Sequence, residues 1–244
     1  MIISAHQPAY MPWLGYLNRI SRSDIFVFLD NVQFERNSFI NRNRIKTLKG
    51  QQWITIPILS KGHMNSTVAE TKIDNRQPWR RKHLRSIEAS YGRSLFFGQN
   101  QKKIESLLLG SEDTIAELCW IHLKFWLAEF EIKTKIVRAS ELNLKNKKSE
   151  MVLELCQTLG SKRYISGPFG KHYLNQDCFD QAGIEIEYDL FEYPIYKQTW
   201  GEFIPGLSCI DFWMNMGPYS FKNIHELHSC ENKDIHKKIF NIEN

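Results

Sequence analysis

The sequence predicts an α/β fold built on an open, mostly parallel sheet with helices on both faces. Two apolar runs, Ile2–Ala5 and Ile25–Asp30, flank a helix-like stretch, and strand and helix patterns alternate again between residues 133 and 188. Continuous apolar runs suit strands covered on both faces, and alternating strands and helices favour a parallel sheet with right-handed crossovers. We therefore expect a Rossmann-like, nucleotidyltransferase-like sheet that carries a helical insertion.

The first half of the chain supplies three predicted strands and most of the insertion. A helix at Leu17–Ser23 separates the two apolar strands, and the alternation in Gln52–Ile58 predicts a third strand. A short strand-like piece follows at Val68–Ile73. Pro78 favours a helix start, so Trp79–Tyr91 is predicted as a helix that Gly92 caps. Two further helices are expected within Gln101–Phe130, the second opening at Ser111–Asp113, where acids favour a helix start.

The second half repeats the strand and helix alternation. The expected elements are a strand within Lys133–Ala139, a helix at Ser149–Leu159, a strand at Arg163–Ser166, a helix at His172–Ala182 and a strand at Ile184–Tyr188. A last helix starts at Ser208, with Asp211 at the capping-box position. We expect one α/β domain over residues 1–222, with the insertion at about 78–131, followed by a polar tail at 223–244.

Composition indicates an ordinary globular protein. The chain has 244 residues, 42% of them hydrophobic, and no run approaches the roughly 20 apolar residues of a membrane span. The N-terminus lacks the features of a signal peptide, so we expect a cytoplasmic protein. Five cysteines lie singly without a CxxC pair, which predicts free thiols. No His and carboxylate cluster has metal-ligand spacing, so we expect no protein-bound metal.

Basic residues gather in two segments of a chain whose net charge is +5. One runs from Arg36 to Lys49 and the other from Arg76 to Arg85. Such segments favour an anionic partner, namely a nucleotide, a phosphorylated sugar or RNA. A solvated surface is the alternative for either segment.

The turn after the first strand holds the first group of candidate site residues. In open α/β sheets ligands bind at the carboxyl ends of strands, and a helix start offers free N–H groups to phosphate. His6 can also transfer a proton near neutral pH, which makes it a candidate catalytic residue. Trp13-x-Gly15-Tyr16 has the spacing of the His-x-Gly-His motif of nucleotidyltransferases but lacks both histidines. The candidate binding residues of this turn are Gln7, Tyr10, Trp13, Gly15 and Tyr16.

Two further groups follow later strands. Asp30 is a second candidate catalytic residue, able to orient an amine or bind ribose hydroxyls. The segment behind it, expected as a basic loop at Arg42–Lys46, offers guanidinium and amide groups that match phosphate. The Ser166–Tyr173 turn resembles a phosphate loop without Walker A spacing. The binding candidates here are Gln33, Asn41, Arg42, Arg44, Lys46, Ser166, Gly167 and Lys171.

Several motifs together resemble the WbqC-like protein family. They are His6-Gln7-Pro8-x-Tyr10-x-Pro12-Trp13-x-Gly15-Tyr16, Asp24–Asp30 with Val32-Gln33, Asn41-Arg42, Trp53-x-Thr55-x-Pro57, Tyr164-x-Ser166-Gly167 and Ser208-x-x-Asp211 with Asn215-x-Gly217. The resemblance runs to about Gly217. It implies a product of bacterial surface-polysaccharide (O-antigen, lipopolysaccharide) gene clusters that acts as a glycine or aminoacyl transferase on amino sugars.

The leading hypothesis is therefore an enzyme that joins an amino acid, which the resemblance implies to be glycine, to the amine of a nucleotide-linked amino sugar. The sequence leaves the cofactor unknown: the acyl donor is activated by ATP with magnesium, by a charged tRNA or by another carrier. One alternative is a nucleotidyltransferase or adenylate-forming enzyme acting on a small acid. The other is a sugar-nucleotide-binding protein without catalytic activity.

Overall fold

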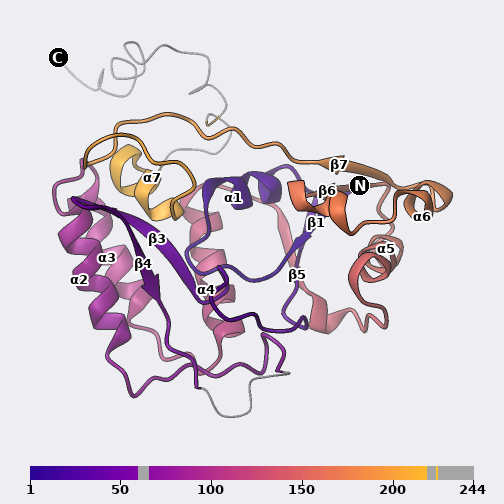
Figure 1. Cartoon of the computed structure of the whole chain (residues 1–244), viewed down its shortest axis with the longest axis horizontal. Coiled ribbons are helices and arrows are strands. Elements are labelled where there is room, and N and C mark those ends of the chain that lie inside the picture. Colours follow the sequence, from indigo (N-terminus) through magenta and orange to yellow (C-terminus); the bar gives the residue numbers. More distant parts are fainter. Residues whose placement is uncertain (60–65, 219–223, 225–244) are drawn as a thin grey trace.

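A five-stranded parallel sheet forms the centre of the protein (Figure 1). The computed structural model describes residues 1–59, 66–218 and 224. The strand order is β5-β2-β1-β6-β7, and every neighbouring pair in it is parallel. The predicted open, mostly parallel sheet is therefore confirmed. Its strands are β1 (Ile2–His6), β2 (Ile25–Phe28), β5 (Lys135–Arg138), β6 (Arg163–Ser166) and β7 (Glu185–Tyr188).

The strand order reverses between β1 and β6. From β1 the chain builds outward through β2 and β5, and then returns to the other side of β1 for β6 and β7. Ile3 pairs with Ile25 on one side and with Tyr164 on the other, so the strands are in register. Connections that diverge from two adjacent strands leave a crevice at the carboxyl edge of the sheet. His6 and Ser166, the last residues of β1 and β6, lie at this edge.

Both faces of the sheet are covered, as the continuous apolar runs predicted. Phe26 and Phe28 of β2 belong to a core shared with α1 (Leu14–Ser21) and α4 (Ile115–Glu129). Val27, which points the other way, belongs to a second core shared with α5 (Lys148–Thr158) and α6 (Gln176–Gln181). Side chains that alternate along β2 therefore pack into two different cores.

An antiparallel hairpin packs beside the helices of the segment expected as an insertion at about 78–131 (Figure 1). The hairpin β3 (Arg42–Thr47) and β4 (Gly50–Thr55) packs on α2 (Trp79–Tyr91), which contacts α3 (Phe97–Leu108). The prediction of a basic loop at Arg42–Lys46 was wrong. Asn43 and Ile45 are buried while Arg42 and Arg44 are partly exposed, which is the alternation of a strand with one covered face.

Other element boundaries differ in detail from the predictions. The third strand ends at Thr55, and Val68–Ile73 makes only isolated bridges. The helix α4 is capped by the Thr114 hydroxyl, which accepts the Glu117 N–H, so the predicted start at Ser111–Asp113 was too early. The helix expected at His172–Ala182 is shorter, since α6 begins at Gln176 and His172 instead ends the 3₁₀ turn η3 (Pro168–His172). The last helix, α7 (Cys209–Met216), begins after Ser208 as predicted.

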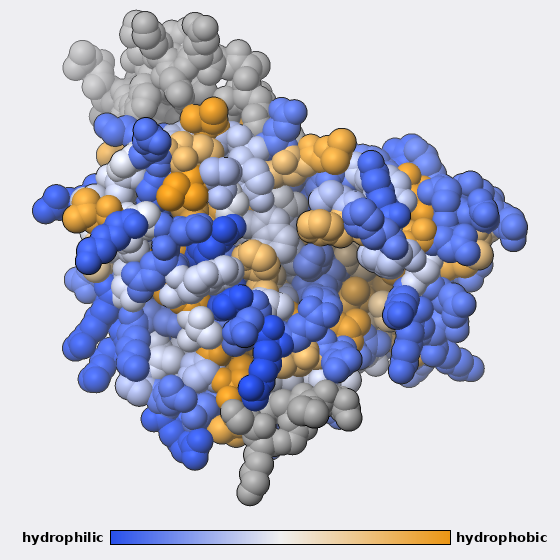
Figure 2. All heavy atoms as spheres, in the orientation of Figure 1, coloured by the Kyte–Doolittle hydropathy of each residue, from blue (hydrophilic) through white to orange (hydrophobic). Residues whose placement is uncertain are grey.

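The surface in the same orientation carries mostly hydrophilic side chains (Figure 2). No helix within residues 1–59 and 66–218 is long and apolar enough to cross a membrane. The predicted polar tail lies outside the described residues, apart from Ile224, which is buried.

Candidate functional site

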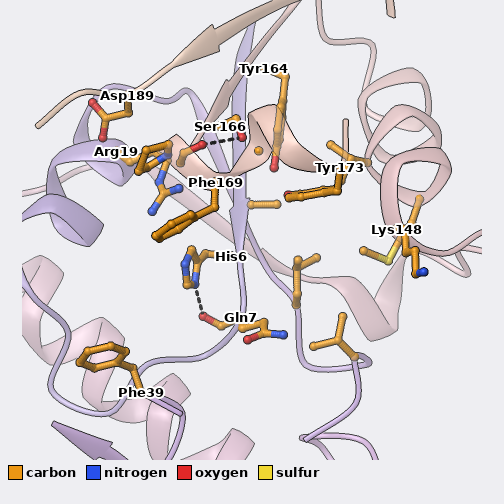
Figure 3. Close-up of a pocket in the computed structure, with 18 of the residues that line it drawn as sticks. His6, Gln7, Arg19, Phe39, Lys148, Tyr164, Ser166, Phe169, Tyr173 and Asp189 are labelled. Carbon is orange, nitrogen blue, oxygen red and sulfur yellow. Dashed lines mark hydrogen bonds between the residues drawn. The ribbon is translucent and has the colours of Figure 1, made fainter. Parts of the chain in front are cut away.

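A cavity of about 1100 Å³ opens at the carboxyl edge of the sheet, where the strand order reverses (Figure 3). Ala5, His6 and Gln7 line it from the end of β1, and Ser166 and Gly167 from the end of β6. Asp189 contributes from the end of β7. The cavity thus lies where parallel α/β sheets bind their ligands.

The His6 side chain lies inside this cavity in a defined tautomer. Its Nδ1 is 2.8 Å from the carbonyl oxygen of Gln7. Because a carbonyl oxygen only accepts hydrogen bonds, Nδ1 carries the proton and Nε2 keeps its lone pair. The rings of Trp13 and Tyr16 pack edge-on against the imidazole, with centroids 5.6 and 5.0 Å away.

The charge state of His6 follows from its surroundings. Loss of solvent around the ring lowers its pKa from 6.5 to about 3, and the positive charge of Arg19 acts in the same direction. His6 is therefore neutral at physiological pH and offers Nε2 as a proton acceptor.

Arg19 of α1 is a site residue that the sequence analysis missed. Its side chain lines the cavity, yet the residue is only 5% exposed. The buried Nε has no hydrogen-bond partner, and neither terminal nitrogen is hydrogen-bonded or ion-paired to a residue in the described part of the chain. In Figure 3 the guanidinium extends into the cavity between α1 and the turn after β6. Nothing in the helix pattern distinguishes it, because all residues from Leu14 to Ile20 are buried.

The turn after β6 forms one wall. The Ser166 hydroxyl donates to the Gly167 carbonyl at 3.1 Å. A side chain at Gly167 would overlap the Arg19 guanidinium, so this position accepts only glycine while Arg19 keeps its place. Phe169, 77% exposed, and Tyr173 add aromatic surface to the cavity. Such rings offer a stacking surface to a base or a sugar.

A lysine-rich loop, Lys145–Lys148, forms a further part of the wall. Lys145, Lys147 and Lys148 line the cavity and are exposed. The Glu154 carboxylate holds the loop by accepting the backbone N–H groups of Lys145, at 3.0 Å, and Asn146, at 2.9 Å. The run of lysines is visible in the sequence, but its position at the cavity depends on this contact.

The lining is therefore strongly cationic. Among the described residues, Arg19, Arg44 and the three lysines line the cavity together with one carboxylate, that of Asp189. That carboxylate is already bound by Arg22 at 2.7 Å and by the Asn18 amide at 3.3 Å. A cavity with this excess of positive charge favours an anionic ligand.

Comparison with known proteins identifies the family of the chain. The model of the WbqC-like protein family matches residues 7–223, which include nearly every wall of the cavity. The chain belongs to the WbqC-like protein family. It is 32% identical over 213 residues to the uncharacterized protein Rv1507c of Mycobacterium tuberculosis, a match covering 86% of this chain and 92% of the relative. No solved structure matches the chain.

The WbqC-like fold brings most of the predicted site residues together. Tyr16 lies behind His6, and its hydroxyl donates to the Gln7 carbonyl at 3.4 Å. Gly15 lies where α1 starts beside the cavity, and Phe191 packs closely over it. The predicted residues that line the cavity are His6, Gln7, Trp13, Gly15, Gln33, Arg44, Ser166 and Gly167.

Three predicted residues lie outside the cavity with partners inside the protein. The Tyr10 hydroxyl is 2.8 Å from Nδ1 of His83 in the core. Asn41 donates to the Ile56 carbonyl at 3.0 Å. Asp30 is 2% exposed, and both of its carboxylate oxygens bind Ser140. The structure therefore surrounds these polar groups with protein partners.

The remaining predicted residues also lie away from the cavity. The Arg42 guanidinium stacks on the exposed Trp53 ring at 4.2 Å. The Lys171 ammonium lies 5.1 Å from the centre of the Tyr188 ring. Lys46 is buried, and its ammonium donates to Gln198 at 2.8 Å and to the carbonyl of Glu202.

Asp211 departs from its predicted capping role. Ser208 caps α7 by accepting the Ile210 N–H, but the Asp211 carboxylate points into the core. It accepts hydrogen bonds from the Tyr196 hydroxyl at 2.7 Å and from Gln198 at 2.9 Å. Asp211 therefore ties the segment at Tyr196–Gln198 to the last helix.

Proposed function

We propose that this WbqC-like protein transfers an amino acid, glycine in the first instance, to the amine of a nucleotide-linked amino sugar in bacterial surface-polysaccharide synthesis. One observation carries the proposal. The cavity at the reversal of strand order combines five cationic side chains with a neutral histidine whose Nε2 is free to accept a proton. Family membership adds the expectation of an amino-sugar substrate.

The lining suits a nucleotide-linked sugar in two ways. Arg19, Arg44 and the lysine-rich loop supply charge for a diphosphate, since Arg and Lys are the usual phosphate partners. Phe169 and Tyr173 supply rings against which a base or a sugar face can pack. A cavity of about 1100 Å³ is also large enough for a ligand with both parts.

His6 would act as the general base of the transfer. The sugar amine attacks the acyl carbonyl, a C–N bond forms, and the bond from the acyl carbon to the carrier breaks. The amine proton passes to Nε2 of His6 and then to the departing carrier group, so that charge and atoms balance. A pKa of about 3 makes His6 by itself a weak base. A bound phosphate that offsets the Arg19 charge would raise this pKa and strengthen the base.

A transfer assay tests the proposal. The pure protein is incubated with a nucleotide-linked amino sugar, glycine, ATP and magnesium, with and without charged tRNA, and the products are analysed by mass spectrometry. The expected result is addition of one glycine residue to the sugar, lost in His6→Gln and kept in the charge-neutral control Gln157→Ala on the outer face of α5. Both variants must show the unfolding temperature of the parent protein.

The other outcomes separate the alternative functions. Pyrophosphate release without a modified sugar would identify a nucleotidyltransferase or adenylate-forming enzyme instead. Saturable binding of the nucleotide sugar without turnover, whatever the donor, would contradict the transferase and identify a binding protein.

A further inference from the structure

We propose that Arg19 and the Ser166–Gly167 turn form a subsite that binds one phosphate group of the ligand deep in the cavity. The subsite rests on the proposed function only for the identity of the molecule that carries the phosphate. Its evidence is the packing around Arg19, which is independent of any reaction.

The first observation is a buried cation that lacks a counter-ion. Arg19 is 5% exposed, and its Nε is buried without a partner. A charged group removed from water is destabilising unless a partner of opposite charge compensates it. The lining carboxylate, Asp189, is engaged by Arg22 and Asn18, and no ion pair to Arg19 occurs in the described ranges. The guanidinium is therefore set to receive an anion from outside the protein.

The second observation is the shape of the turn beside it. Gly167 lies so close to the guanidinium that any side chain there would collide with Nη1 of Arg19. The turn begins at the end of β6, beside β1 where the strand order reverses, and parallel α/β sheets bind phosphates at such places. The close approach of backbone and guanidinium leaves the donors of Arg19 facing the cavity (Figure 3).

The titratable rings beside Arg19 in the described part of the chain are uncharged. His6 is neutral, and burial raises the pKa of Tyr164 and Tyr173 above their usual value, so both phenols stay protonated. Arg19 is therefore the buried cation of the cavity, whereas Lys145, Lys147 and Lys148 are exposed at its margin. Salt screens exposed charges far more than buried ones. Binding through Arg19 should accordingly resist salt better than binding through the lysines.

The test measures binding, so its result does not depend on any transfer reaction. Calorimetry at 0.15 and 0.5 M salt measures the affinity for three probes: inorganic pyrophosphate, uridine diphosphate and uridine. The proteins compared are the parent, Arg19→Met, Arg19→Lys and Gly167→Ala. Arg163→Gln is the control, because it removes the same charge from a surface ion pair at the amino end of β6.

We expect Arg19→Met to weaken binding of pyrophosphate and uridine diphosphate about 10- to 100-fold, the range for charge-assisted hydrogen bonds. Arg19→Lys should retain part of the affinity, and Arg163→Gln all of it. Without ligand, Arg19→Met should unfold at the same or a higher temperature than the parent, because an uncompensated buried charge has gone. A purely structural arginine would instead give a lower unfolding temperature.

Other results would overturn the subsite. Unchanged pyrophosphate affinity in Arg19→Met would place the phosphate on the lysines. If Arg19→Met weakened the binding of glycine or acetate but not of pyrophosphate, Arg19 would belong to a carboxylate site instead. If Arg19→Met fails to fold, pyrophosphate binding to Gly167→Ala tests the subsite instead. This variant keeps the charge of Arg19 and displaces its guanidinium. Affinity equal to that of the parent in Gly167→Ala would reject the proposal. An upward shift of the His6 pKa on pyrophosphate binding, followed by NMR, would support it.

Discussion

The carboxylate of Asp30 accepts two hydrogen bonds from Ser140, one from the backbone N–H at 2.9 Å and one from the hydroxyl at 2.8 Å. Asp30 follows β2 and Ser140 follows β5, so this contact joins the ends of two neighbouring strands at the edge that carries the cavity. Both carboxylate oxygens are thereby occupied. The geometry favours a role for Asp30 in holding the edge of the sheet.

We therefore expect Asp30→Ala to lower the free energy of unfolding by about 2 kcal/mol, because it leaves the Ser140 donors without their charged acceptor. Ser140→Ala removes only one of the two bonds and should cost less. Urea unfolding of both variants checks this order. An Asp30→Asn protein of parent stability that has lost all transfer activity would contradict it and support the catalytic role predicted from the sequence.

The sequence was sufficient to predict the sheet but not the inner surface of the cavity. Apolar strands and the alternation of strands with helices determine a parallel sheet and its carboxyl edge, which is why His6, Ser166 and Gly167 lie at that edge as predicted. The position of Arg19 could not be found in this way. Whether an arginine in a helix faces solvent or a cavity depends on what packs over the helix, and that information is not local.

The hairpin illustrates a different limit. The alternation of Arg42, Arg44 and Lys46 resembles a basic loop, because charges outnumber apolar groups. Only pairing with β4 and burial of Ile45 against the insertion make it a strand. The same pairing directs Arg44 toward the cavity and Arg42 onto Trp53. Tertiary contacts therefore give neighbouring basic residues different positions, one at the cavity and one on an exposed ring.

Binding of a phosphorylated ligand should depend on salt through the lysine-rich loop. Replacing Lys145, Lys147 and Lys148 together by Gln should weaken uridine diphosphate binding at low salt and flatten its decline with rising salt. The matched control replaces Lys133, Lys135 and Lys162, three exposed lysines at the amino edge of the sheet. Equal losses in both triple variants would mean that overall charge, rather than the loop, attracts the ligand. Calorimetry between 0.05 and 0.5 M salt separates the two outcomes.

His122 should make the protein sensitive to acid. Complete burial lowers its pKa from 6.5 to about 3, and the positive charge of Arg80 acts in the same direction, against the smaller effect of the Leu107 backbone. The unfolded chain binds this proton below pH 6.5, whereas the folded chain does not. The stability that neutral His122 contributes is therefore present above pH 6.5 and is lost as the pH falls, by about 1.4 kcal/mol per unit.

His122→Phe removes the titrating ring and should make the fall in unfolding free energy between pH 6 and 4 shallower by that amount. The exposed His172→Phe serves as the control. Urea unfolding at several pH values measures both slopes. Identical slopes in the parent and His122→Phe would show that the folded protein protonates His122 as readily as the unfolded chain.

Asp211 should act with the opposite sign. Its burial raises the carboxyl pKa from 3.8 to about 6, although the hydrogen bonds from Tyr196 and Gln198 and the charge of Lys46 limit the rise. The folded protein therefore holds this proton more tightly than the unfolded chain. The contribution to stability is full below pH 3.8 and is lost as the pH rises through 6. A shift of this size corresponds to roughly 3 kcal/mol.

Asp211→Asn has no such titration, so its unfolding free energy relative to the parent should be more favourable at pH 7 than at pH 4. A difference that stays constant across this range, or one that reverses, would mean that Lys46 keeps the buried carboxylate ionised at low pH.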